Sequence, residues 1–398
     1  MSQSMTISKA DIERFIDRDR LVERLRSLVQ AESENPPGRE AGAAAIAEKQ
    51  CREIGLDVSL HEAEPDRPSV VARWSQGKGR VVGFCSHIDV VPAGDPTLWE
   101  RDPYGADVID GRLHGRGSGD AKGPCAAALE AAAVLKEAGF EFAGTLEMSF
   151  VADEEAAGFK GAGYLADKGI LKPDIAVVGE PTSLRVVRAQ RGVCWFRITT
   201  RGKAGHGSAP ERGVNAVKHM AEIVLHLEET LPDIVHPVVG GPSIGVGTIR
   251  GGEKVNIVPA SCIAEIDRRS VPPETKEDVI ASLQKAVDLA KRRFPEIDAH
   301  IELPFYGDPF EVDMDSEVVT TVLSSVEDAL GRPGEIMGFR GASDARFLSA
   351  KGAEVVVCGP GDITLAHTAH ESIDLDELER GAVAYALAFA RMLSPDDV

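Results

Sequence analysis

The chain has 398 residues, enough for two domains or one large α/β domain, and its hydrophobic content of 43% is ordinary for a globular protein. The net charge of −20 argues against nucleic acid and anionic membranes as partners. No apolar run approaches the ~20 residues that cross a bilayer, and the polar start, MSQSMTISKADIERF, is unlike a signal peptide. Six scattered cysteines without a CxxC pair favour free thiols in a reducing compartment, so we expect a cytoplasmic protein.

The chain up to Glu180 alternates between helical and strand-like patterns. Apolar spacing first predicts two helices and then three short strands, at residues 8–31, 38–54, 57–60, 69–74 and 80–86. A hairpin with a Gly-rich turn, a helix closed by Gly139 and two further strands follow at residues 106–117, 121–139, 144–152 and 174–180. This alternation predicts an α/β fold with a mixed, mostly parallel sheet between helices.

The pattern changes after GEPT (179–182). The segments that follow predict strand, helix, strand, strand and helix, at residues 194–204, 213–230, 244–252, 262–271 and 275–294. From residue 305 the α/β pattern returns, with a strand in AEVVVCG and a closing helix over residues 374–393. We therefore expect a catalytic domain formed by residues 1–186 and 305–398, interrupted by a smaller α+β domain at residues 187–304.

Chemically active side chains follow several of the predicted strands. In open α/β sheets, ligands bind beyond the carboxyl ends of the strands. The residues expected at that edge are His87, Asp89, Asp120, Glu154, Glu155, Glu180 and His367. Each one alone is more often a turn or cap residue. Together, the carboxylates would repel one another, and divalent cations would relieve that repulsion. Mixed histidine and carboxylate ligands suit zinc, with cobalt or manganese as alternatives.

The three consecutive carboxylates of VADEEAAG, residues 153–155, suggest a division of roles. In extended backbone, successive side chains point to opposite sides. Glu154 and Glu155 would then not bind the same metal, and one would ligate while the other handles protons. For this run alone, an acidic loop at a strand end is the plainer interpretation; the other segments favour a site.

Other catalytic motifs fit less well. Ser243 in GPSIG matches the GxSxG nucleophile elbow, but GPSIG precedes a strand, whereas the elbow follows a strand and opens a helix. HExxH, GxGxxG and Walker motifs are absent from the sequence. Adjacent carboxylates do not suit glycoside hydrolysis, and 5% aromatic residues is low for a sugar platform. A serine hydrolase that uses Ser243 and a metal-binding protein without catalysis are the alternatives of another class.

Six ordered motifs resemble those of a known family. SHIDVVP, GRGSGDAKG, ADEEAAG, GEPT, GKAGHGSAP and AHTAHE stand in the order found in the dinuclear zinc amidohydrolases and exopeptidases. That family includes acetylornithine deacetylase, succinyl-diaminopimelate desuccinylase, aminoacylase and a glutamate carboxypeptidase. The resemblance covers nearly the whole chain from about residue 20, and it is more specific for the family than for any one member.

The resemblance implies two zinc ions, with cobalt or manganese as substitutes, bound by five side chains. His87 and Glu180 would bind one ion, Glu155 and His367 the other, and Asp120 both. Asp89 would orient the His87 imidazole, and Glu154 would be the general acid and base.

The resemblance also implies roles for the inserted domain as a lid and a dimerisation domain. His206 resembles the histidine that reaches the active site of the partner subunit, so we expect a homodimer. Asn256, Arg269 and Arg340 stand where the family tends to bind the substrate carboxylate, although each could instead be a turn or surface residue.

Two positions depart from the family pattern. Ser86 replaces the glycine that often precedes the first histidine, and being small it should preserve the turn. His370 stands where relatives often have Asp or Asn, and it competes with His367 as a ligand. The HxxxE spacing to Glu371 favours His367.

The resemblance implies metal-dependent hydrolysis of the amide bond of an N-acyl amino acid, as in acetylornithine deacetylase or the desuccinylase. A metal-bridged hydroxide would attack the amide while Glu154 shuttles the proton, and His206 would stabilise the oxyanion. The alternative is a dipeptidase or carboxypeptidase of the same family. We expect a small acyl amino acid or peptide as the substrate, and no nucleic acid or membrane partner.

Overall fold

The structure, a computed structural model, describes residues 7–394, and this part of the chain forms two compact units. The first comprises the described residues up to Arg188, Val312–Met337 and those from Ser343 onward; the second comprises Ala189–Glu311 and Gly338–Ala342. We expected the inserted domain at residues 187–304. The second unit extends beyond that range at its carboxyl end, to Glu311, and also includes the short segment Gly338–Ala342, where the chain returns to it. Every helix within residues 7–394 is too short or too polar to span a bilayer.

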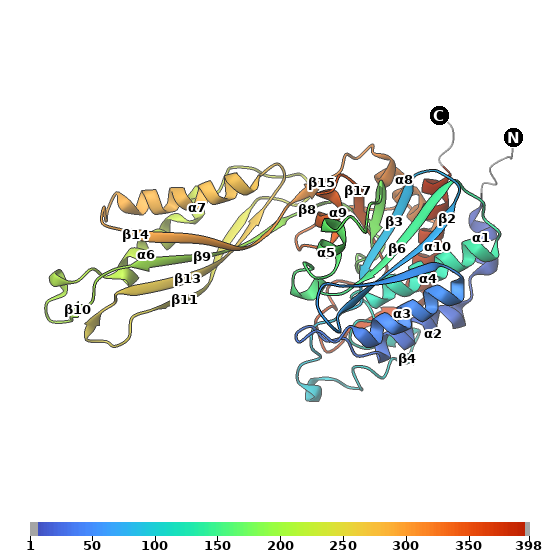
Figure 1. Cartoon of the computed structure of the whole chain (residues 1–398), viewed down its shortest axis with the longest axis horizontal. Coiled ribbons are helices and arrows are strands. Elements are labelled where there is room, and N and C mark those ends of the chain that lie inside the picture. Colours follow the sequence, from blue (N-terminus) through green and yellow to red (C-terminus); the bar gives the residue numbers. More distant parts are fainter. Residues whose placement is uncertain (1–6, 395–398) are drawn as a thin grey trace. The chain divides into compact units, whose positions relative to one another are not determined.

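The first unit contains most of the helices (Figure 1). They are α1 (Lys9–Phe15), α2 (Arg18–Gln30), α3 (Ala41–Ile54), α4 (Lys122–Glu137), α5 (Ala162–Asp167), α8 (Glu317–Leu330), α9 (Ala345–Ser349) and α10 (Leu375–Leu393). Its strands are β1 (Asp57–Glu62), β2 (Pro68–Gln76), β3 (Val81–His87), β4 (Asp107–Ile109), β5 (Arg112–His114), β6 (Gly144–Val151), β7 (Ile175–Val178), β17 (Glu354–Val357) and β18 (Ser372–Asp374). The strands β8 (Val186–Gln190) and β16 (Ile336–Phe339) begin in this unit.

The main sheet of the first unit is mixed, with a parallel centre. Its strands follow the order β1-β2-β6-β3-β7-β17, and the pairs β6–β3, β3–β7 and β7–β17 are parallel. β1 and β2 extend one side in antiparallel orientation. The residues of β7 are all buried, as expected for a parallel strand covered on both faces. The carboxyl ends of β6, β3, β7 and β17 therefore meet at one edge of the sheet.

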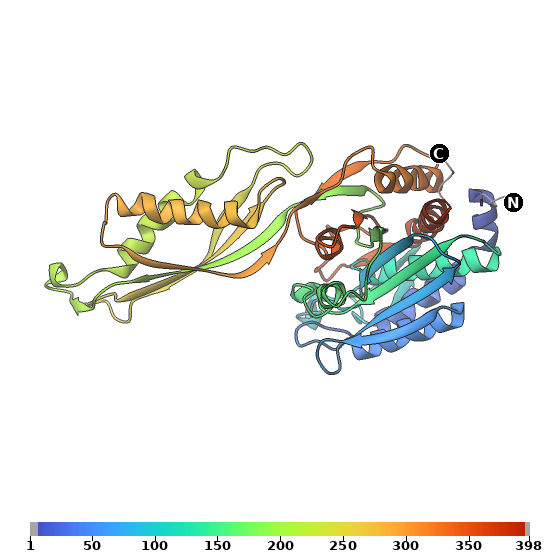
Figure 2. The ribbon, with the colours of Figure 1, turned by 45° about the horizontal axis from the view of Figure 1, so that its top comes forward.

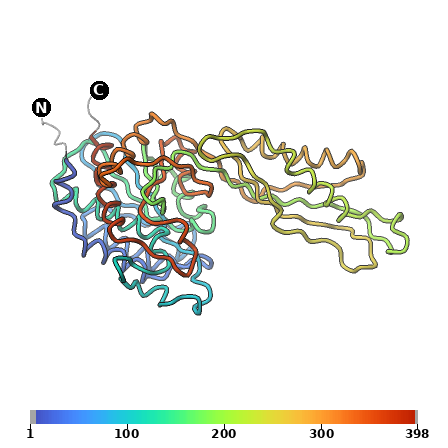
Figure 3. Tube along the Cα trace, turned by 180° about the vertical axis from the view of Figure 1, so that it is seen from behind, coloured from blue at the N-terminus to red at the C-terminus, as the bar shows by residue number. Residues whose placement is uncertain are grey.

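A layer of helices packs on this sheet (Figure 2). α3 contacts β1 and β2, α4 and α10 contact β3, and α8 contacts β7 and β17. The sequence of α4 is rich in alanine and the helix is buried on nearly all sides, because α2 covers the side that faces away from the sheet. α1 at the start of the chain packs against α10 near its end (Figure 3).

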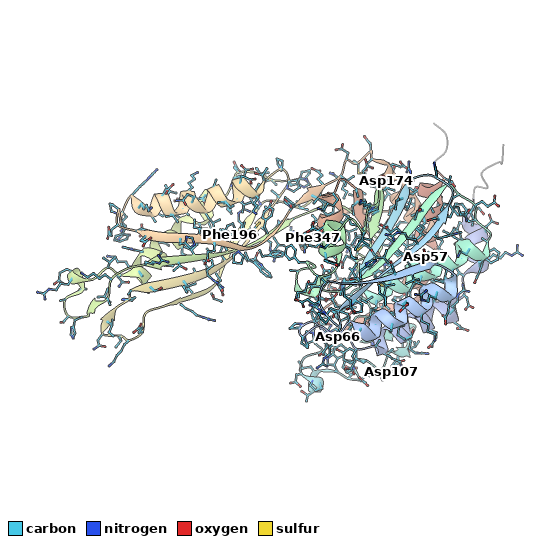
Figure 4. All side chains as sticks on the ribbon, viewed as in Figure 1. Asp57, Asp66, Asp107, Asp174, Phe196 and Phe347 are labelled. Atoms are coloured by element: carbon cyan, nitrogen blue, oxygen red, sulfur yellow. The ribbon has the colours of Figure 1, made fainter. Side chains whose placement is uncertain are left out.

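The second unit is a sheet with two helices. Its elements are β9 (Gly192–Arg201), β10 (Gly205–His206), α6 (Ala216–His226), β11 (Ser243–Gly251), β12 (Ile257–Val258), β13 (Ser261–Ser270), α7 (Lys276–Lys291), β14 (Asp298–Gly307) and β15 (Phe310–Glu311). The antiparallel sheet has the order β11-β13-β9-β14. Inward residues such as Phe196, labelled in Figure 4, form its core with α6 and α7.

Several elements differ from the sequence-based expectation. The helix expected over residues 8–31 is two helices, because Asp17 caps α2 by accepting the backbone N–H of Arg20 at 3.0 Å. The strand β14 and the helix α8 were not predicted. Pro304 in β14 argues against a strand, and the structure accommodates it at a register shift between Glu302 and Phe305. The first six residues of the polar start lie outside the described residues.

Candidate active site

The parallel strands deliver acidic and imidazole side chains to one edge of the first unit. His87 is the last residue of β3, Glu155 follows β6, and Glu180 follows β7. Asp120 lies two residues before the start of α4, and His367 lies in the segment after β17. The expected convergence therefore has a simple structural cause, because the carboxyl ends of these strands are neighbours.

Asp120 lies between the two histidines. Its Oδ1 is 3.2 Å from His87 Nε2, and its Oδ2 is 3.3 Å from His367 Nε2. Glu155 Oε2 is 3.2 Å from the same His367 nitrogen, and Glu180 Oε2 is 3.9 Å from His87 Nε2. One carboxylate therefore presents a different oxygen to each histidine, and each histidine has a second carboxylate beside it.

This cluster has the composition and spacing of a metal site. One ligand atom each from His87, Asp120 and Glu155 lie within 4.8 Å of one another. The Glu155 Oε1 atom is buried and has no hydrogen-bond partner among the described residues. A buried carboxylate oxygen without a partner is costly unless a ligand satisfies it. The cluster can therefore hold a divalent cation, and imidazole and carboxylate donors suit zinc.

Burial and crowding shift the pKa values of these groups. Burial, followed by the charge of Glu180, raises the pKa of Glu154 well above its usual range. Burial is likewise the main cause of the strongly raised pKa of Glu180. Burial opposes ionisation of Asp120 too, but hydrogen bonds from His367 and His87 dominate and lower its pKa. The hydrogen bonds to Asp120 and Glu155 raise the pKa of His367 to about 10. A bound cation would relieve the repulsion among these carboxylates.

Glu371 fixes the loop that carries Asp120. Its Oε1 accepts the backbone N–H groups of Gly117, Gly119 and Asp120 at 3.0, 3.2 and 3.1 Å. Its Oε2 pairs with the buried guanidinium of Arg116. Because Glu371 stands four residues after His367, a single segment provides one imidazole and anchors the loop of Asp120.

Asp89 has different partners from those expected. His87 Nδ1 hydrogen-bonds to the backbone carbonyl oxygen of Asp89 at 2.9 Å, whereas the nearest carboxylate oxygen is 3.6 Å away. The Asp89 carboxylate instead accepts the backbone N–H groups of Glu154 and Glu155, each at 3.1 Å. Asp89 therefore orients the imidazole through its backbone and secures the acidic turn through its side chain.

The backbone of the acidic run is not extended, so that premise of the sequence argument was wrong. Glu154–Ala156 form a short 3₁₀ turn, and Asp153 before it has a left-handed conformation with φ of 73°. The two glutamates nevertheless have different surroundings. Glu155 contacts His367, whereas the carboxylate of Glu154 makes no hydrogen bond to any residue in the range 7–394. The turn, and not the alternation of a strand, separates them.

The two neighbouring histidines also have different surroundings. His367 contacts both Asp120 and Glu155. Both histidines are exposed, but for His370 the bond that the structure shows is made by the backbone N–H, to Thr368 Oγ1 at 3.2 Å. The structure therefore places His367 in the cluster.

The remaining expected residues belong to the second unit. His206 ends β10 and is exposed, and Asn256 is exposed in the segment before β12. Arg269 lies on β13 and pairs with Asp267 through Nε and Oδ1 at 2.8 Å. Arg340 is exposed in the short return segment. The roles of these four residues in substrate binding and catalysis remain predictions.

Sequence reasoning missed several residues near these groups. Asp344 is buried, burial raises its pKa to about 7, and neither carboxylate oxygen has a hydrogen-bond partner among the described residues. Arg67 pairs with Asp153 at 3.0 Å. Arg191 in the second unit lies near Arg269 and Arg340, and burial followed by their charges lowers its pKa. None of these residues belongs to one of the six motifs, and the sequence alone gives no sign that Asp344 and Arg67 are buried.

Comparisons with known proteins show the family to which this chain is similar. The model of the peptidase family M20/M25/M40 matches residues 83–391. Acetylornithine deacetylase from Photorhabdus laumondii is 32% identical over 336 residues, which is 81% of this chain and 83% of that protein. Acetylornithine deacetylase from Pectobacterium carotovorum is 33% identical over 334 residues, covering 80% of this chain and 83% of that protein.

Solved structures show the same fold at lower identity. Aminopeptidase PepT from Bacillus cereus has a TM-score of 0.79 and 23% identity, covering 94% of this chain and 99% of that one. The YXEP protein of Bacillus subtilis, described as a dinuclear metal binding peptidase, has a TM-score of 0.71 and 18% identity, covering 97% of this chain and 99% of that one.

Proposed function

We propose that this chain, which belongs to the peptidase family M20/M25/M40 and is therefore a metal-dependent hydrolase, cleaves the amide bond of N-acyl amino acids. The observation that carries the proposal is the position of Asp120, whose two oxygens face His87 and His367 at 3.2 and 3.3 Å. The names of the deacetylase relatives support the acyl amino acid as the substrate.

The cluster fits a pair of divalent cations, and we propose zinc, with cobalt or manganese as substitutes. His87 and Glu180 would hold one ion, Glu155 and His367 the other, and Asp120 both. The partnerless Oε1 of Glu155 supports Glu155 as a ligand, because the protein itself leaves that buried atom unsatisfied. When bound, such ions lower the pKa of a coordinated water and polarise the amide carbonyl.

Glu154 is the proposed proton carrier. It takes a proton from the attacking water and returns it to the nitrogen of the leaving amine. Burial and the charge of Glu180 raise its pKa, and bound cations would act in the opposite direction. Its carboxylate makes no hydrogen bond to another residue in 7–394, and the residue is partly exposed. The Asp89 carboxylate holds the backbone of Glu154 in place.

His206 is the proposed donor to the oxyanion that forms on the attacked carbonyl. The backbone N–H of Ser208 donates to His206 Nδ1 at 3.2 Å. In the neutral ring, Nε2 therefore carries the hydrogen and can donate it. A donor at an oxyanion contributes about 3–4 kcal/mol to the lowering of the barrier. The resemblance supports the idea that this histidine comes from the partner subunit.

The substrate carboxylate would bind to arginines of the second unit. Arg191, Arg269 and Arg340 lie close enough that the charges of the other two lower the pKa of Arg191. Only Arg269 has a carboxylate partner among the described residues. A cluster of guanidinium groups with unused donors suits a carboxylate anion, and Asn256 would add a neutral donor.

Metal removal and a substrate screen test the proposed function. Dialysis against a chelator should abolish hydrolysis of N-acetylornithine, N-succinyl-diaminopimelate or another N-acyl amino acid, and zinc or cobalt should restore it. A dipeptidase or carboxypeptidase is the second candidate, because structural neighbours are named as peptidases. Preferred turnover of dipeptides would identify that candidate, and turnover that survives the chelator would refute both.

We also propose that two copies pair through the second unit. β11 lies at an edge of its sheet, so one side of the strand has no partner strand among the described residues. Such an edge can pair with another copy of the chain. Light scattering should then give twice the chain mass of 42.4 kDa, and the mass of a single chain would contradict the pairing.

A further inference from the structure

The first carboxylate of the acidic run, Asp153, is bound outside the metal cluster. Its Oδ1 is 3.0 Å from Nη1 of Arg67, and its Oδ2 accepts the backbone N–H of Lys160 at 3.0 Å. Its carbonyl oxygen accepts the N–H groups of Ala156 and Gly158 at 3.1 and 2.6 Å. Asp153 therefore starts and closes the turn that contains Glu154 and Glu155.

The left-handed backbone of Asp153 needs support. A φ of 73° is uncommon for residues other than glycine, although aspartate tolerates it better than most. Backbone conformations of this kind persist only where the surrounding structure holds them. The contacts of the Asp153 side chain are the evident support: Oδ2 accepts the backbone N–H of Lys160, and Oδ1, which makes no hydrogen bond among the described residues, forms an ion pair with Arg67 at 3.0 Å.

Arg67 connects this turn to a second buried acid. Arg67 is 6% exposed, and its Nε donates to Glu40 Oε2 at 3.1 Å while its Nη2 pairs with Glu40 Oε1. Glu40 is completely buried. One guanidinium thus balances two buried carboxylates, Glu40 and Asp153. Gly38 leaves room for it, since a Cβ there would lie 2.4 Å from Arg67 Nε.

The other side of the turn is fixed by Asp89. Its two oxygens accept the N–H groups of Glu154 and Glu155, each at 3.1 Å. Asn35 donates to the same carboxylate at 2.9 Å. The peptide groups before and after each glutamate are therefore restrained from both sides, and these restraints set the directions of the Glu154 and Glu155 side chains.

We propose that Arg67 is a positioning residue of the active site, which acts through Asp153 to hold Glu154 and Glu155 in their working orientations. This inference rests on the proposed function, since it assigns Arg67 a role in placing the proton carrier and a metal ligand. Arg67 itself contacts neither the cluster of His87, Asp120 and His367 nor Glu154.

Without the guanidinium, Glu40 and Asp153 would be two buried carboxylates without a cation between them. Asp153 would gain more by turning its carboxylate toward water than by keeping its present conformation. The turn would then relax, and a displacement of about 1 Å at a catalytic group can lower the rate by about 10²-fold.

The test compares Arg67→Met, Arg67→Lys and Asp153→Asn with the wild-type chain. Arg67→Met should lower kcat by about 10- to 100-fold, with a much smaller change in KM, and should weaken metal retention on dialysis. Arg67→Lys should recover part of both losses, because it restores the cation. Arg67→Met combined with Asp153→Asn should lose much less than the product of the two single effects, since both act on one contact.

Arg24→Met is the matched control. Arg24 is also a buried arginine of the first unit, and its Nε lies 3.2 Å from the completely buried Glu130. Its loss should lower the melting temperature and leave kcat and bound metal unchanged. Equal losses of kcat in Arg24→Met and Arg67→Met, or wild-type kcat and metal content in Arg67→Met, would overturn the proposal. If Arg67→Met does not fold, Asp153→Asn decides in the same way.

Two readouts separate this inference from the proposed function. If the wild-type chain turned over none of the acyl amino acids and dipeptides, the proposed function would fail. The number of bound zinc ions per chain, measured by elemental analysis after dialysis, would still decide whether Arg67 acts on the site. Unchanged zinc retention in Arg67→Met and in Asp153→Asn would then overturn the inference.

Discussion

Glu154→Gln should lower kcat by about 10²- to 10⁴-fold, while KM and the bound metal stay near their wild-type values. Glutamine preserves the size and polarity of the side chain, but it cannot take a proton from water and return it to an amine. The carboxylate of Glu154 has no hydrogen-bond partner among the described residues, so its replacement should leave the fold unchanged. Steady-state kinetics and elemental analysis of the same preparation measure the two quantities.

The matched control is Glu62→Gln, which changes an exposed glutamate at the end of β1 and should leave kcat unchanged. Full activity of Glu154→Gln would remove the proton-carrier role. Ser243→Ala serves to test the serine alternative, because Ser243 is exposed at the start of β11. A dead Ser243→Ala variant with intact metal content would favour a serine nucleophile over the metal site.

Asp120→Asn should lose bound metal as well as turnover. Both carboxylate oxygens face a histidine, at 3.2 and 3.3 Å, and an amide offers only one oxygen in their place. The loss of metal affinity should exceed the ~10- to 100-fold typical of changes to residues behind the ligands. Calorimetric titration of the metal-free chain with zinc gives the affinity for zinc and the number of zinc ions bound.

Asp57→Asn is the control for that experiment. Asp57, labelled in Figure 4, is an exposed residue of β1, and its loss should leave zinc binding unchanged. Asp120→Asn that still bound two zinc ions with wild-type affinity would contradict the bridging role. Loss of one ion alone would assign Asp120 to a single metal.

The gathering of the candidate site residues at one edge of the sheet could be predicted from the sequence, because local patterns determine where the strands end. Short apolar runs such as IAVV in β7 indicate buried parallel strands, and the residues that follow them must gather at one edge. His87 and Glu180 could therefore be placed from their positions after β3 and β7. His367 was placed from spacing and resemblance, and its contacts with Asp120 and Glu155 agree with that choice.

The conformation of the acidic turn could not be predicted in the same way. It depends on Arg67 and Asp89, which are far from Asp153 in the sequence and carry no local signal of their partners. For this reason the assumption of extended backbone failed, although the separation of Glu154 from Glu155 remained. β14 was not predicted because a proline such as Pro304 argues against a strand. The register shift that accommodates the proline arises in the pairing with β9 and cannot be seen in the local sequence.

The most direct measurement of the central claim is the anomalous scattering of crystals grown with zinc or cobalt. The account predicts two peaks, each about 2.0–2.2 Å from a different oxygen of Asp120. One peak should also lie beside His87 and Glu180, and the other beside Glu155 and His367. Peaks elsewhere in the chain, with none at Asp120, would contradict a hydrolase that works through this cluster.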